Sequence, residues 1–213
     1  MKQAPQNVPL LVPLNWDEMQ IMDFLHESNL IEDEGSMIAL EDAVLAWNYA
    51  YEHRHKIDLD YILEIHRLLG QRIAPKLAGK WRDCDVWIGN QFKPFTSEAL
   101  IKENMKRWLQ DTKVTAARKR MAEQSKETLV RKWHVAYEQV HPFVDINGRS
   151  GRILMNIQRL LLGLPLWVID HRTRWEEYYP LFRDTYCDEC GKTYCKHYKS
   201  DFDKFIQKNP LKL

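Results

Sequence analysis

The sequence predicts an all-α domain that carries a single short β-hairpin. Apolar side chains recur at intervals of three and four residues in several separate stretches, which is the spacing of one face of a helix. Only Lys80 to Phe95 departs from this pattern, because Val86 and Ile88 alternate as in a strand and Gly89-Asn90 suits a turn. A lone hairpin needs helices to pack against. We therefore expect one helical domain with the hairpin lying on it.

Five helices are expected before the most informative loop. Asn15, with Glu18 three residues later, is a candidate N-cap for a first helix that ends near Ser28. Asp58 is a candidate N-cap for the third helix. The apolar stripes of the other four helices are Met37, Leu40, Val44, Trp47 and Tyr51; Leu59, Ile62, His66 and Leu69; Ile101, Met105 and Trp108; and Leu129, Trp133, Ala136 and Val140.

Composition agrees with a globular protein of ordinary size. The chain has 213 residues, 45% of them hydrophobic, and a formal net charge of +1. This balance supports a substantial core and gives no general attraction to nucleic acid or to an anionic membrane. Because no apolar run reaches membrane-spanning length and no Sec signal pattern opens the chain, we expect a cytoplasmic protein or an exported effector without such a signal.

Residues 141–152, with the sequence HPFVDINGRSGR, directly precede a further apolar helical run. Pro142 disfavours helical geometry at His141, so the preceding helix should end there and present the imidazole at an exposed elbow. Asn147-Gly148 opens the next helix, whose free N–H groups and positive dipole end favour an anion. We expect the bound anion to be a phosphate.

Two arginines and one aspartate suit a metal-bound nucleotide at this loop. Arg149 and Arg152 are three residues apart, so their guanidinium groups lie on one helix face and can both bind phosphate oxygens. Asp145 offers the hard oxygen ligand that Mg²⁺ accepts beside phosphates and water. Periodicity extends the polar face to Asn156 and Arg159, opposite the core-facing residues Ile153, Ile157, Leu160 and Leu161.

The loop resembles the Fic family signature H-P-F-x-D-G-N-G-R-x-x-R, whose best-known members transfer AMP from ATP to a protein hydroxyl. By this resemblance His141 is the general base and Asp145 holds Mg²⁺. The resemblance assigns Asn147 and the backbone around Gly148 to the α- and β-phosphates, and Arg149 and Arg152 to the β- and γ-phosphates. Phe143 would anchor the loop in the core, and Gly151 belongs to the same nucleotide-binding stretch.

One position departs from the signature. Ile146 stands where the family has Gly or sometimes Ala, and a β-branched residue does not readily take a positive φ. The loop must therefore use an ordinary backbone conformation there or carry strain. Gly148 is retained, unlike in the kinase toxins of the Doc branch, which have Lys at that position, so the resemblance favours nucleotidyl transfer over phosphoryl transfer.

The hairpin also matches a family feature. Residues 78–82, AGKWR, followed by Val86, Trp87 and Ile88, resemble the start of the flap that holds the target chain beside the histidine. Backbone pairing at such an edge aligns an extended segment whatever its sequence. Composition alone would instead favour a surface loop that caps the core.

An upstream segment resembles the inhibitory motif of one regulatory class of the family, [S/T]-x-x-x-E-[G/N]. Ser28 and Glu32 match it, while Asp33 replaces the last position. In that class the glutamate pairs with the second signature arginine, here Arg152, and obstructs the γ-phosphate. The alternative is an acidic helix end that is merely solvated.

Three of the four cysteines cluster near the C-terminus with a histidine, in the order Cys187, Cys190, Cys195 and His197. Without a secretory signal, such a cluster is read as a metal site before it is read as disulfides. Three thiolates and one imidazole would complete a structural Zn²⁺ site, with His171 as an alternative nitrogen ligand. Reduced or redox-active thiols are the alternative.

Together these patterns predict a Fic-fold transferase in four parts: residues 1–27 as an extension and first helix, 28–36 as an inhibitory motif, 37–170 as the Fic core, and 171–213 as a C-terminal helical region with the Cys/His cluster. The expected activity is transfer of AMP from ATP to a Ser, Thr or Tyr hydroxyl of a target protein or of the chain itself. Partners would be that target and an antitoxin or other regulator. Another donor, removal of AMP, or a catalytically weak nucleotide-binding module are the alternatives.

Overall fold

A computed structural model describes residues 9–86 and 97–185, and every described element is helical. The seven α-helices are α1 (Glu18–Leu30), α2 (Met37–Glu52), α3 (Leu59–Gly70), α4 (Ile101–Asp111), α5 (Ala116–Lys119), α6 (Glu123–Val140) and α7 (Asn147–Leu162). Four short helical turns complete the described part: η1 (Glu98–Leu100), η2 (His171–Thr173), η3 (Arg174–Tyr178) and η4 (Tyr179–Thr185). The prediction of an all-α fold is confirmed.

Side-chain caps fix where the first three helices begin. Asp58 caps α3 as predicted, because its carboxylate accepts a hydrogen bond from the Tyr61 N–H. Ser36 caps α2 in the same way. The prediction for α1 was wrong at both ends: Asp17, not Asn15, caps it, and the helix continues to Leu30. Asp17 is better placed because its side chain reaches the N–H groups of both Met19 and Gln20.

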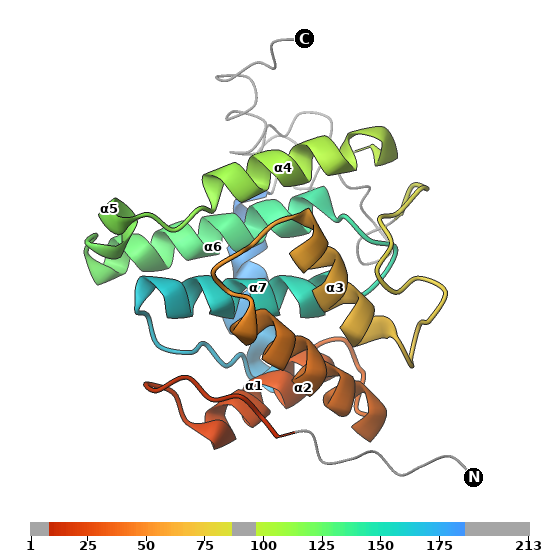
Figure 1. The fold of residues 1–213 in the computed structure, drawn as a ribbon, viewed down its shortest axis with the longest axis horizontal. Helices are drawn as coiled ribbons and strands as arrows, with labels where there is room; N and C mark the ends of the chain where they lie inside the picture. The colour runs from red at the N-terminus through yellow and green to blue at the C-terminus, as the bar shows by residue number, and fades with distance from the viewer. Residues whose placement is uncertain (1–8, 87–96, 186–213) are drawn as a thin grey trace.

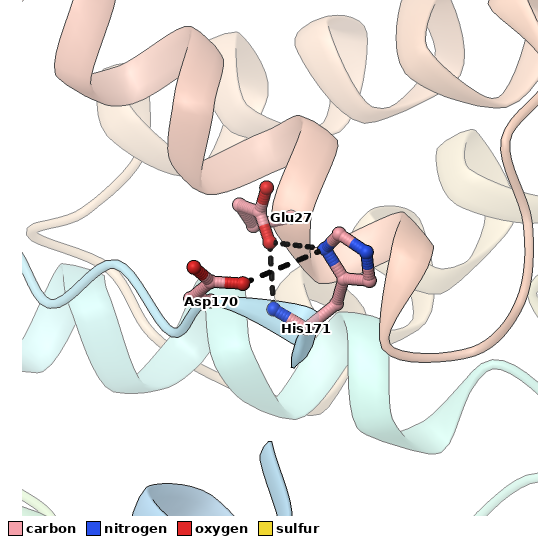
Figure 2. A group of neighbouring side chains, drawn as sticks. All are labelled: Glu27, Asp170 and His171. Atoms are coloured by element: carbon pink, nitrogen blue, oxygen red, sulfur yellow. Dashed lines mark hydrogen bonds and ion pairs between the residues drawn. The ribbon is translucent and has the colours of Figure 1, made fainter. Parts of the chain in front are cut away.

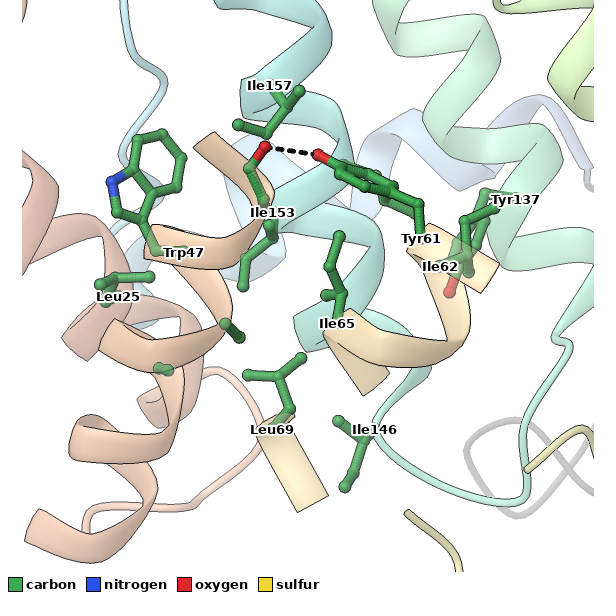
Figure 3. Packing of buried hydrophobic residues seen from close by; sticks show 14 of the residues in the cluster. Leu25, Trp47, Tyr61, Ile62, Ile65, Leu69, Tyr137, Ile146, Ile153 and Ile157 are labelled. Atoms are coloured by element: carbon green, nitrogen blue, oxygen red, sulfur yellow. Dashed lines mark hydrogen bonds between the residues drawn. The ribbon is translucent and has the colours of Figure 1, made fainter. Parts of the chain in front are cut away.

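Helix α7 lies at the centre of the molecule (Figure 1). It contacts α1, α2 and α3 on one side and α6 on the other, while α4 packs on α6. The core between these helices is made by apolar residues of the predicted stripes, including Trp47 from α2, Ile62 and Leu69 from α3, and Ile153 and Ile157 from α7 (Figure 3). The loop that joins α6 to α7 therefore starts and ends in well-packed helices.

A second, smaller apolar cluster lies between α6, α7 and the chain that follows α7. Its buried members are Ile31, Val130, Trp133, Met155, Leu162, Leu164, Ile169 and Tyr178. Ile31 comes from the end of α1, so this cluster joins that end to the residues around Tyr178. Helix α1 runs unbroken across the boundary expected at residue 27.

Most of the predicted hairpin lies outside the described residues. Val86 is buried, but Trp87 and Ile88 lie outside the described residues. No strand occurs in residues 9–86 or 97–185. Within those ranges, none of the helices combines the length and the apolar character that a membrane crossing requires.

Candidate active site

His141 occupies the turn that ends α6. Its backbone is left-handed, with φ 47° and ψ 64°, and its N–H still bonds the Tyr137 carbonyl at 3.1 Å. The helix thus ends where Pro142 predicted. The side chain is half-buried instead of exposed, because the loop folds back toward the core.

Arg82 fixes this turn from outside the signature. Its Nε donates to the His141 carbonyl at 2.8 Å, and its backbone N–H donates to the Pro142 carbonyl at 3.0 Å. A third bond, from Nη1 to the Cys84 carbonyl at 2.9 Å, ties the same guanidinium to its own segment. Arg82 is buried, so the loss of these bonds would leave a buried charge unsatisfied. The residue therefore couples the segment before Val86 to the histidine turn.

His66 supports the loop one step further on. It accepts the Gly79 N–H at Nδ1 (3.0 Å), so its proton lies on Nε2, which donates to the Asp145 carbonyl at 3.1 Å. Burial lowers the pKa of His66 to about 4, which keeps the ring neutral. Its ring stacks on Phe143, with centroids 3.7 Å apart. Sequence periodicity placed His66 in an apolar stripe and missed this polar role.

Phe143 and Asn147 hold the loop from inside. Phe143 is fully buried and also stacks on Trp81. The Asn147 side chain accepts from the Phe143 N–H and donates to the Phe143 carbonyl, both at 2.9 Å. Both ends of the Asn147 amide are thus engaged by the loop backbone. The buried Phe143 side chain belongs to the main core and anchors the loop there.

The N-terminus of α7 has no side-chain cap. Its N-cap residue is Ile146, and the Asp145 carboxylate accepts the Ile146 N–H at 2.6 Å before the helix starts. Beside this end lies Arg149, which is buried, and its Nε has no hydrogen-bond partner among the described residues. Burial lowers the pKa of Arg149, and Asp145 and Glu32 act against that change. An uncapped helix end beside an unpaired guanidinium is a site for an anion.

Arg152, by contrast, is fully engaged. Its Nε donates to the Ser28 hydroxyl at 2.9 Å, and its Nη2 donates to the Ser28 carbonyl at 2.8 Å and to Glu32 Oε1 at 2.7 Å. Nη1 bonds the Tyr178 hydroxyl at 3.3 Å. The guanidinium is buried beneath the end of α1, and Ser28 and Glu32 occupy its Nε and Nη2 donors.

Glu32 lies directly over the start of α7. A Cβ added at Gly148 would collide with the Glu32 carboxylate, so this glycine allows the close approach. Burial alone would raise the pKa of Glu32, but Arg152, together with Arg149 and His141, lowers it. The turn needs a left-handed residue next, and Asp33 supplies it with φ 56°. Aspartate tolerates this conformation, which accounts for its place where the motif has Gly or Asn.

His141 itself is held neutral. Burial lowers its pKa to about 4, Arg82 contributes in the same direction, and the Glu138 carbonyl opposes them. At neutral pH the ring can therefore accept a proton.

Gly151 lies on the side of α7 that faces α6. A Cβ there would approach Tyr137 Cδ1 to 2.9 Å and collide with the Glu138 carboxylate. Burial raises the pKa of Glu138 to about 8, and its Oε1 has no hydrogen-bond partner in the described part of the chain. Gly151 thus permits close contact between the two helices, a role that its place in the signature did not suggest.

Two residues of the predicted polar stripe do not face a ligand. Arg159 pairs with Glu127 at 2.6 Å, and the Asn156 amide bonds the backbone of Trp167. The prediction was wrong for both, because the chain after α7 folds back over that face.

Asp145, in contrast, is an exposed residue of the loop. Cys187, Cys190, Cys195 and His197 lie outside the described residues.

Ile146 takes the strained alternative, with φ 65° and ψ 13°, while its side chain is buried against Gly70. Strain costs about 1–2 kcal/mol, whereas the loss of a buried isoleucine costs about 2–5 kcal/mol. Ile146→Gly should therefore lower the free energy of unfolding by about 1–3 kcal/mol in urea titrations. Ile146→Ala is the control: it should be no more stable than Ile146→Gly, since Ala keeps the strain. A clearly more stable Ala variant would contradict a strained site.

His134 makes stability depend on pH. It is buried and bonds the Tyr178 hydroxyl at 2.8 Å, and burial, with Arg152, lowers its pKa to about 3. Below pH 6.5 the His134 ring takes up a proton in the unfolded chain but not in the folded chain. The free energy of unfolding therefore decreases as the pH is lowered. Between pH 7 and 5 the wild type should lose about 2 kcal/mol more than His134→Gln, measured by denaturation at each pH. Equal losses would show that His134 titrates normally.

Comparisons with known proteins show what this chain is similar to. Residues 56–158 match the model of the Fic/DOC family. Protein adenylyltransferase fic-1 of Caenorhabditis briggsae is 30% identical over 152 residues, which are 70% of this chain and 28% of that protein. Protein adenylyltransferase Fic of Drosophila erecta is 25% identical over 150 residues, again 70% of this chain and 29% of the relative. This chain thus spans under a third of the length of these relatives.

Solved structures share the fold. Fic-1 (aa134 - 508) from C. elegans superposes with a TM-score of 0.61 at 21% identity, covering 77% of this chain and 55% of that one. A Fic domain containing signaling protein from Bacteroides thetaiotaomicron gives a TM-score of 0.64 at 15% identity, covering 80% and 76%. At these identities the likeness concerns the arrangement of helices.

Proposed function

Because this chain belongs to the Fic/DOC family through its residues 56–158, we propose that it transfers AMP from ATP to a hydroxyl side chain of a protein. The names of its relatives, protein adenylyltransferases, support this reaction.

One observation carries the proposal: Arg149 is buried beside the uncapped start of α7, and its Nε has no hydrogen-bond partner among the described residues. A buried guanidinium with an unsatisfied donor is costly, and a bound phosphate removes that cost. Asn147 and Gly148 would add backbone N–H donors. Arg152 would bind a further phosphate once Glu32 leaves it. A polyphosphate ligand fits this set better than a single phosphate.

In the proposed reaction His141 is the general base. The target's hydroxyl oxygen forms a bond to the α-phosphorus while the bond from that phosphorus to the bridging oxygen breaks, so pyrophosphate leaves. His141, neutral at pH 7, takes the hydroxyl proton. Asp145 is the residue that would hold Mg²⁺: it is exposed, and one oxygen of its carboxylate is engaged by a backbone N–H while the other is available. Mg²⁺ bound there would neutralise phosphate charge.

The same proposal includes restraint by the end of α1. Glu32 and Ser28 take the Arg152 donors, and the Glu32 carboxylate lies over Gly148. A phosphate and a carboxylate compete for the same guanidinium. ATP bound in this state would lack its contact with Arg152, so we expect low basal activity.

Mass spectrometry after incubation with ATP and a cell lysate tests the function. Expected is an AMP adduct on one or more proteins, this chain included, that is lost in His141→Ala. Parallel incubations with other nucleotides and with a target already carrying AMP distinguish a different donor and AMP removal. Binding of ATP without any adduct in Glu32→Gly would instead identify a nucleotide-binding module and overturn the transferase.

A further inference from the structure

The inhibitory end of α1 is held by a second set of contacts, from the chain after α7. Glu27 Oε2 accepts the His171 N–H at 2.7 Å and lies 2.8 Å from the His171 Nδ1 (Figure 2). Asp33 pairs with Arg174 Nη2 at 3.7 Å. The Arg174 Nη1 also donates to the His171 carbonyl at 2.7 Å. The two holding residues are therefore bonded to each other.

These contacts flank the residues that block the site. Ser28 lies in the last turn of α1 and Glu32 in the turn that follows the helix, and both bind Arg152. Glu27 precedes Ser28 and Asp33 follows Glu32. Ile31, between them, is 3% exposed and belongs to the second apolar cluster together with Tyr178. The blocking segment is thus fixed at both flanks by residues after α7.

The last turn of α1 needs such support. It contains Glu27 and no basic residue, so a carboxylate stands at the negative end of the helix dipole. The two His171 donors offset that unfavourable placement. Earlier turns of α1 are secured separately, because Ile21, Phe24 and Leu25 lie in the main core. Loss of the His171 contact should therefore loosen the end of the helix without displacing the rest.

A bound cation is the competing explanation for this group. Ligand atoms of Glu27, Asp170 and His171 lie within 4.8 Å of one another, a spacing that could hold a metal ion. However, both Asp170 oxygens are bonded to Arg172, and Glu27 Oε2 already accepts the two N–H groups of His171. A cation would have to displace these donors, so hydrogen bonding is the better explanation.

We propose that His171 and Arg174 form a latch that holds the Glu27–Asp33 segment on Arg152, so that release of the latch, as well as loss of Glu32, activates the enzyme. This inference rests on the proposed function and adds a second point of control, located on the chain that leads to the C-terminus.

Incorporation of α-labelled ATP and amide hydrogen exchange test the latch in the same variants of the whole 213-residue chain. His171→Ala and Glu27→Ala should each raise AMP incorporation about twofold to tenfold, the effect of losing one hydrogen-bonded contact. Exchange in peptides covering residues 24–33 should increase in both. Their double variant should match either single one, and His171→Ala should add nothing to Glu32→Gly. Arg172→Ala is the matched control, since its guanidinium bonds only Asp170 in the described chain.

The two proposals fail in different ways. If Glu32→Gly raises incorporation but the latch variants match wild type in both rate and exchange, the latch is wrong and the proposed function stands. If Glu32→Gly stays inactive, the proposed function is wrong, while faster exchange in His171→Ala still supports the contact between the segments. An additive gain of His171→Ala on Glu32→Gly would also overturn the latch, because its effect would not act through Glu32.

Discussion

Glu32→Gly is expected to raise the rate of AMP incorporation at least about tenfold, because it removes a charge-assisted bond of about 1.5–3 kcal/mol that competes with phosphate. The structure gives two reasons for an effect of this size. Glu32 Oε1 lies 2.7 Å from the Arg152 Nη2, and the carboxylate covers Gly148 at the start of α7. Both contacts disappear in the variant, while the Ser28 contacts with Arg152 remain. Incorporation of α-labelled ATP into protein measures the change.

Glu34→Gly is the matched control for this prediction. Glu34 is a neighbouring acid whose carboxylate accepts the Ser36 N–H at 2.9 Å and makes no contact with Arg152. Its removal should leave the rate near that of wild type. Glu32→Gln gives a second comparison, since the amide keeps the size of the side chain but loses the charge, and an intermediate rate is expected. A folded Glu32→Gly protein with the wild-type rate would rule out restraint by Glu32.

The helices could be predicted because their apolar stripes are local properties of the sequence. The spacing of apolar residues such as Trp47 and Ile62 predicts α2 and α3, and Asp58 marks the start of α3 with a side-chain cap. The elbow at His141 was likewise predictable, because Pro142 restricts the residue before it. The start of α1 was not, since Asn15 and Asp17 are both good capping residues and only the folded chain selects one.

The surroundings of the site depend on contacts between distant residues, which spacing cannot reveal. His66 and Arg82 donate hydrogen bonds to backbone carbonyls of the loop. Every residue has such a carbonyl, so the sequence does not indicate which residues these two side chains contact. Arg159 shows the opposite error: periodicity identifies its helix face but not the segment that covers it. The pairing of Arg152 with Glu32 was anticipated from the family motif alone. Nothing in the local pattern links residues so far apart.

His141→Ala should give the largest loss of activity, about 10²- to 10⁴-fold, when it is introduced into Glu32→Gly. The loss follows from removal of the base that takes the hydroxyl proton, while Arg149, Arg152 and the start of α7 remain to bind ATP. Nucleotide affinity, measured by calorimetry, should therefore change little. Because burial lowers the pKa of His141 to about 4, the ring stays neutral at pH 6, and its own titration should not reduce the rate between pH 7 and 6.

A histidine outside the site separates this effect from a general loss of stability. His55 is exposed, and His55→Ala in the same background should keep the full rate. Rates should be compared at equal folded fraction, because the His141 turn also carries the Arg82 bonds to the backbone. Those bonds end on main-chain atoms and survive in the alanine variant, so the two roles of the turn can be told apart. A folded His141→Ala protein that transfers AMP at more than a tenth of the parent rate would show that another group accepts the proton, and would exclude His141 as the general base.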